Sequence, residues 1–144
     1  MGLLSRFRSA APAKRPSDDV LLMLSMLLMS GADGYFDESE VGSVAAFVGQ
    51  LPEFKGKELE ELIAQASKLA NKYSNFLDAV ESLRELSSDT VKRKAFVLAA
   101  DLAMSSGEVD EAEDELLTRM QRILGVDDFT AQKVLEVLAM KYAR

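Results

Sequence analysis

A short acidic phrase occurs twice in this chain, 73 residues apart, and it constrains the fold more than any other feature. Residues 33–40 read DGYFDESE and residues 106–113 read SGEVDEAE, so both follow the pattern [D/S]-G-x-apolar-D-E-x-E. Each copy follows one apolar helical run and precedes another. We call these segments the first and the second acidic turn. Their repetition predicts a duplicated helix–turn–helix architecture with two related acidic sites.

The apolar pattern repeats along with the acids. At the same offset of 73 residues, the aligned pairs are Leu24 with Val97, Asp37 with Asp110, Glu40 with Glu113, Val44 with Leu117, and Leu51 with Leu124. A chance match of eight residues would not extend through both flanking helices. The duplication is therefore expected to cover whole helices as well as the turns.

Helical periodicity and capping residues divide the chain into about seven helices. Pro52 ends the second helix, and Gly125 follows the sixth at a position suited to a left-handed C-terminal cap. No segment alternates with period two, so no strand is predicted. The predicted helices cover residues 18–31, 38–51, 57–72, 75–86, 89–105, 110–124 and 128–142. We therefore predict an all-α, single compact bundle at residues 18–144, with an internal pseudo-repeat.

Each predicted helix has an apolar face that we expect to point into the core. Within residues 89–105 this face comprises Phe96, Val97, Ala100 and Met104. Within residues 110–124 it comprises Leu116, Leu117, Met120, Ile123 and Leu124. Within residues 128–142 it comprises Val134, Leu135, Leu138 and Tyr142.

Cysteine, histidine and tryptophan are absent from all 144 residues. No disulfide can form, and neither Ser–His nor Cys–His nucleophilic catalysis is possible within the chain. Zinc sites built from Cys and His are excluded as well, so any bound metal must be a hard cation held by oxygen atoms. An acid–base enzyme with paired carboxylates would need a cleft and two carboxyl groups of different pKa. We expect a protein that is not an enzyme.

Charge divides the chain into a basic tail and an acidic domain. Residues 1–17 carry +4, and since the whole chain carries −7, the remaining residues sum to −11. An acidic domain repels nucleic acid, so no nucleic-acid partner is expected. We expect the tail to be disordered and to make at most weak contact with an anionic membrane surface, at about 1 kcal/mol per basic residue.

The apolar run Val20–Met29 follows this tail and must be distinguished from a targeting or membrane segment. Ten residues are too few to span a membrane. Asp18 and Asp19 stand directly before the run, and they argue against a secretory signal peptide. We therefore expect a core helix, no transmembrane segment and a cytoplasmic protein.

Two interpretations of the acidic turns remain open. In the first, Asp37 with Glu40 and Asp110 with Glu113 form capping boxes, in which each carboxylate accepts a backbone amide hydrogen bond. Gly34 and Gly107 would then allow the turns a positive φ. In the second, the turns bind a divalent cation through their carboxylates. Residues 108–115 contain six acids in eight positions, and their mutual repulsion favours a cation or a basic partner.

The spacing of Asp33, Asp37 and Glu40 matches the fifth, ninth and twelfth positions of an EF-hand loop. The first and third positions would be Met29 and Gly31, or Leu102 and Met104 in the second copy, and none of these offers a side-chain oxygen. An EF-hand is therefore excluded. A shared site between two facing turns stays possible, with calcium, magnesium or manganese as the cation. Its predicted ligands are Asp33, Asp37, Glu40, Asp110 and Glu113, with Asp101 either nearby or on the exposed stripe of its helix.

Several short segments together resemble the TerB-like tellurite-resistance family. They are Ala32–Glu40, Leu51–Phe54, Ala99–Ala103, Gly107–Glu113 and Leu124–Asp127, and the resemblance covers residues 18–143. It implies an all-helical domain with an internal pseudo-repeat and with clustered acids proposed to bind metal. It also implies a role in bacterial tellurite and stress resistance, often near the inner face of the membrane. Ser106 departs from the family pattern, which usually has Asp there, so the first turn should dominate any site.

Together these observations predict a cytoplasmic, TerB-like stress-response protein that acts through a cation or a protein partner. The alternative is a purely structural helical adaptor whose acids only cap helices and solvate exposed faces. An enzyme is the third and least favoured class, and no substrate can be named for it.

Overall fold

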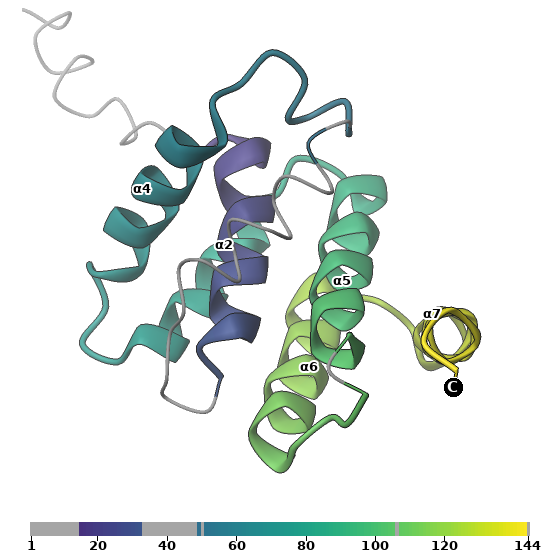
Figure 1. Cartoon of the computed structure of the whole chain (residues 1–144). Helices are drawn as coiled ribbons and strands as arrows, with labels where there is room; N and C mark the ends of the chain where they lie inside the picture. Colours follow the sequence, from purple (N-terminus) through teal and green to yellow (C-terminus); the bar gives the residue numbers. More distant parts are fainter. Residues whose placement is uncertain (1–14, 33–48, 50, 106, 144) are drawn as a thin grey trace, which may run out of the picture.

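Six helices make up the part of the chain that the structure describes (Figure 1). This computed structural model describes residues 15–32, 49, 51–105 and 107–143. Within these ranges it contains no strand, so the all-α prediction is confirmed. About seven helices were predicted, and the one at 38–51 falls almost entirely outside the described residues. The observed helices are α2 (Asp18–Ser30), α4 (Leu59–Ala70), the 3₁₀ helix η1 (Phe76–Glu85), α5 (Asp89–Met104), α6 (Glu111–Leu124) and α7 (Asp128–Lys141).

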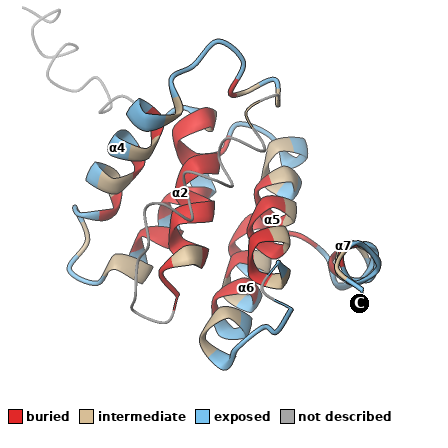
Figure 2. Cartoon of the chain, in the orientation of Figure 1, coloured by how far each residue is buried: buried red, intermediate tan, exposed pale blue. Residues whose placement is uncertain are grey.

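Helix α2 runs through the middle of the bundle. Every residue from Val20 to Met29 is buried, and the helix packs against α4, η1, α5 and α6. Figure 2 shows α2 almost wholly in the buried colour between α4 and α5. A helix that is apolar on all sides is stable only in such a central position. The ten-residue run is thus a core helix, as predicted, and no helix in the described part of the chain is long and apolar enough to cross a membrane.

The segment predicted as a helix at 75–86 is a 3₁₀ helix from Phe76 to Glu85. The apolar spacing explains this difference. Leu77, Val80, Leu83 and Leu86 recur every three residues, which places them on one face of a helix with three residues per turn. Val80, Leu83 and Leu86 are buried, and Leu77 packs against the core. Asn75 begins the helix, because its side chain accepts a hydrogen bond from the Leu77 amide (3.1 Å).

Helices α5 and α6 flank the second acidic turn and form the second of the two predicted repeat units. At the offset of 73, the residues of α2 fall on 91–103, inside α5, and these two helices pack against each other. The core face predicted for α5 was partly wrong, since Val97 and Met104 are only half-buried. The buried arc is wider, because α5 contacts α2, α6 and α7, and it includes Leu98, Ala99, Leu102 and Ala103.

Helix α6 buries the five apolar residues predicted for it. Gly125 ends the helix with φ of 66°, which confirms the left-handed cap. Helix α7 then lies beside α5 at the edge of the bundle (Figure 1). Leu138 is buried as predicted, Val134, Leu135 and Tyr142 are half-buried, and Ala131 is a further buried contact.

Candidate functional site

The second acidic turn forms a capping box at the start of α6. The Asp110 carboxylate accepts a hydrogen bond from the Glu113 amide (2.8 Å), and the Asp110 amide donates to Glu113 Oε1 (3.2 Å). Gly107 has φ of 91°, a conformation that glycine adopts at no steric cost. The capping box predicted for the second acidic turn is therefore confirmed.

Most of the acids around this turn are exposed, and three of them have no cationic partner among the described residues. Glu108, Asp110, Glu111, Asp114 and Glu115 are all exposed. Glu111, Asp114 and Glu115 make no ion pair with any residue in the described ranges. The positive end of the α6 dipole offsets part of this negative charge, by about 0.3–1 kcal/mol for each acid in the first turn. The segment therefore presents a negative surface to solvent. We call residues 108–115 the acidic segment.

Arg119 follows the acidic segment on α6, but it forms its ion pairs with residues of η1. Its guanidinium lies 3.4 Å from Asp78 and 3.5 Å from Glu81, both on η1. Glu81 also accepts from Arg84 (2.9 Å), and this hydrogen bond lowers the pKa of Glu81. Arg119 thus joins α6 to η1 and is engaged away from the acidic segment.

Asp101 lies on α5 and contacts α7. Its carboxylate accepts hydrogen bonds from Lys141 Nζ (2.8 and 3.1 Å) and from the Tyr142 hydroxyl. The hydrogen bond to Asp101 raises the pKa of Lys141, whereas burial is the main cause that raises the pKa of Tyr142. We call these three residues the α7 latch. The residues next to Asp101 in the sequence do not predict this contact, because Lys141 and Tyr142 are 40 and 41 residues away.

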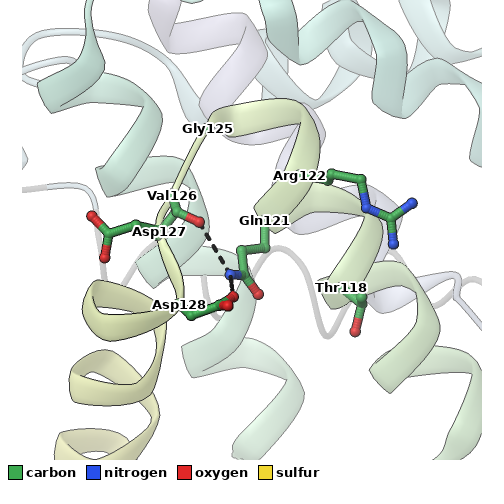
Figure 3. Close-up of a pocket in the computed structure, with 7 residues that line it drawn as sticks. All are labelled: Thr118, Gln121, Arg122, Gly125, Val126, Asp127 and Asp128. Carbon is green, nitrogen blue, oxygen red and sulfur yellow. Dashed lines mark hydrogen bonds between the residues drawn. The ribbon is translucent and has the colours of Figure 1, made fainter.

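A surface pocket of about 520 Å³ lies where α6 connects to α7 (Figure 3). Gln121 Nε2 donates to the Val126 carbonyl (3.1 Å) and to Asp128 Oδ1 (2.8 Å). Asp127 caps α7 by accepting from the Thr130 amide (2.7 Å), and this bond lowers the pKa of Asp127. In Figure 3 the side chains of Asp127 and Arg122 point to opposite sides of Gln121. The polar groups of this pocket hold the α6–α7 connection and do not converge on a ligand position.

A known protein family matches the helical part of the chain. The model of the family described as tellurite resistance protein TerB matches residues 19–135. The chain belongs to the TerB family. The match runs from α2 into α7, so the resemblance seen in the short segments is confirmed. Neither the curated proteins nor the solved structures gave a match.

The cation site predicted at the acidic turns involves residues from both copies of the acidic phrase. Asp33, Asp37 and Glu40 lie outside the described residues. Among the residues that are described, no group of three or more acids is close enough to hold a metal ion. Asp110 and Glu113 are adjacent but form the capping box, and Asp101 belongs to the α7 latch. A metal centre would thus need carboxylates from the first acidic turn, and its full ligand set stays a prediction.

Proposed function

We propose that this TerB-family protein is a non-enzymatic, cytoplasmic interaction module of a bacterial stress response. Its acidic turns bind a divalent cation or a basic segment of a partner protein. The observation that supports this proposal is the acidic segment, where Glu111, Asp114 and Glu115 are exposed and have no ion pair in the described part of the fold. Such a surface attracts cations and basic partners, and it repels nucleic acid.

The link to tellurite is then indirect. Tellurite is an anion, and its reduction relies on thiols. These 144 residues contain no cysteine, and their net charge is −7. The chain therefore supplies neither an attractive surface for the anion nor an electron donor. A role in tellurite resistance is more consistent with the assembly or signalling of other components than with chemistry on tellurite itself.

A second candidate is a structural adaptor that binds no metal, and the capping box favours it. Asp110 and Glu113 already stabilise the start of α6 through two hydrogen bonds. In this case the acids of both turns serve the fold, and partner binding uses another surface. The two candidates make different predictions for the response of the protein to cations.

Thermal melts with EDTA, calcium, magnesium and manganese distinguish a module that binds a cation from an adaptor that binds no metal. A cation present at 100 times its Kd should stabilise the fold by about 2.7 kcal/mol. Asp37→Ser retains an N-capping oxygen and Asp33→Asn suits the same type of turn, but each removes a charge. We expect both variants to lose the stabilisation by cations, and we expect the metal-free protein to keep its stability or gain some because repulsion is relieved. A parent protein that responds to no cation would favour the adaptor.

Asp110→Ser and Asp127→Ser form a matched pair for this test. Both residues are helix N-caps whose carboxylates accept a backbone amide hydrogen bond at 2.7–2.8 Å. Serine keeps the cap, so neither change should alter the stability of the cation-free protein appreciably. Only Asp110→Ser should weaken the cation response. If Asp127→Ser weakens it equally, the effect is a general loss of charge and the assignment to the acidic turns is wrong.

A further inference from the structure

Four exposed side chains lie in a line along the outer face of α7, on the side away from α5. They are Phe129, Lys133, Glu136 and Met140, and we call them the outer stripe. At 3.6 residues per turn they occupy a narrow arc opposite Ala131 and Leu138, which are buried. Figure 2 shows α7 at the edge of the bundle, mostly in the exposed colour. This helix therefore presents a complete outer face to solvent.

The outer stripe is apolar at both ends. Phe129 is 70% exposed and Met140 is 71% exposed, and Val137, which flanks the stripe, is 57% exposed. Three of the four large apolar side chains that are exposed in the described part of the chain are thus on α7. Single exposed apolar residues are common on protein surfaces, but a group on one helix face is typical of an interaction site.

The centre of the stripe carries one charge of each sign. Lys133 Nζ lies 4.3 Å from the centre of the Phe129 ring, and Glu136 accepts a hydrogen bond from Gln132 (3.3 Å). Neither charge has an ion-pair partner within the described ranges of the chain. Both are therefore available to a charge of opposite sign on a partner.

The order and spacing of the four residues in the outer stripe indicate the identity of that partner. The four residues are separated by four, three and four positions, so the spacing is the same in both directions. When two copies of α7 run antiparallel about a twofold axis, Phe129 faces Met140 of the other copy, and Lys133 faces its Glu136. A twofold interface requires this kind of self-complementarity, in which each contact occurs twice. A second copy of α7 therefore supplies a matching residue at every position of the stripe.

We propose that the outer stripe of α7 pairs with the outer stripe of a second copy of this chain. Two apolar contacts at the ends enclose two Lys133–Glu136 ion pairs at the centre. One helix face is smaller than the roughly 800 Å² per partner of a standard interface. The dimer is therefore a weak one that forms at high protein concentration. This proposal is independent of the acidic turns and of their cation.

Charge exchange tests the proposal, with sedimentation velocity measured on the full chain over a range of concentrations. The parent should shift from monomer to dimer as its concentration rises. In Lys133→Glu two pairs of acids meet across the axis, and in Glu136→Lys two pairs of bases meet, so either change should weaken association by on the order of tenfold or more. The double variant Lys133→Glu/Glu136→Lys should restore dimerisation. An equimolar mixture of the two single variants should form a mixed dimer, since one stripe is then acidic and the other basic.

Removal of an apolar end gives a second test with a matched control. Met140→Ser should weaken the dimer, whereas Val109→Ser changes an exposed apolar residue that is not part of α7 and should not. The substituted residues are exposed, and unchanged circular dichroism confirms that each variant is folded. A parent that stays monomeric throughout would overturn the proposal, and the face would then be free or serve a different partner. A dimer that persists in both single charge variants would also overturn it, because another surface would hold the copies together.

Discussion

Gly31 shows how a single residue depends on a contact distant in the sequence. It follows the last residue of α2 with φ of −101°, a conformation open to any residue. A Cβ added there would lie 2.9 Å from Cε1 of the Phe76 ring on η1. A larger residue at this position would thus require the Phe76 ring to shift, although the backbone conformation would accept it. The sequence shows the glycine but not the ring that approaches it.

We predict that Gly31→Ala destabilises the fold by about 1–3 kcal/mol, because Phe76 must move away from the added methyl group. Urea denaturation of the parent and the variant measures this difference. Phe76→Leu removes most of the ring, so Gly31→Ala should cost less in that background than in the parent. Equal costs in both backgrounds would show that the contact with the ring is not the cause.

At the scale of secondary-structure elements, α7 is held differently from the other helices. It buries only Ala131 and Leu138, whereas α2 buries every residue from Val20 to Met29. The α7 latch supplies the polar part of its attachment to α5 through Asp101, Lys141 and Tyr142. The position of α7, and with it the direction of the outer stripe, therefore depends on charges that titrate.

We predict that the contribution of the α7 latch is lost at alkaline pH. Lys141 and Tyr142 have raised pKa values, so the folded protein holds these two protons more tightly than the unfolded chain does. The stabilisation is complete below their ordinary values of 10.5 and 10.0, and it disappears as the pH rises through the folded-state values. Asp101→Asn should cost about 1 kcal/mol or less at neutral pH, since Lys141 is partly exposed and screened by solvent.

Melting temperatures of the parent and of Asp101→Asn, measured from neutral to strongly alkaline pH, check this prediction. The two curves should converge as Lys141 and Tyr142 lose their protons. Asp78→Asn is a suitable control, because its ion pair with Arg119 involves a guanidinium that stays charged over this range. If the difference in melting temperature between the parent and Asp101→Asn stays constant or increases with pH, the role of the α7 latch is contradicted.

At the scale of the whole molecule, stability is concentrated around α2. This one helix packs against α4, η1, α5 and α6, so a cavity beside it affects four neighbours at once. Close packing leaves few ways for these neighbours to move into the space. The first helices of the two predicted repeat units, α2 and α5, are packed together in this core.

We predict that Leu24→Ala lowers the free energy of unfolding by about 2–5 kcal/mol, since Leu24 is completely buried in α2. Val109→Ala removes apolar atoms from a partly exposed residue outside the core and should change stability by less than about 0.5 kcal/mol. Chemical denaturation followed by circular dichroism measures both. Comparable losses for the two variants would contradict a core centred on α2.

The sequence predicted the capping box of the candidate site but not the contacts of Asp101. The capping box of Asp110 and Glu113 follows from residues three positions apart, and the structure confirms it. The role of Asp101 did not follow, because the sequence left it either on an exposed stripe or near the acidic turns. Its partner Lys141 comes from another helix. The facing arrangement of the two acidic turns stays a prediction, since the first turn lies outside the described residues.

The sequence alone determined the helical class, the approximate bounds of the helices in the described part and the buried face of α6, and it determined the buried faces of α5 and α7 in part. These properties depend on periodicity, caps and breaking residues within one helix, as in Gly125 at the end of α6. Only the tertiary structure decided which helices meet, and with that the contact of Phe76 with Gly31 and the α7 latch. It also decided which face of α7 is covered by α5 and which remains exposed. Contacts between distant residues depend on how the helices pack around α2, and local periodicity carries no information about that packing.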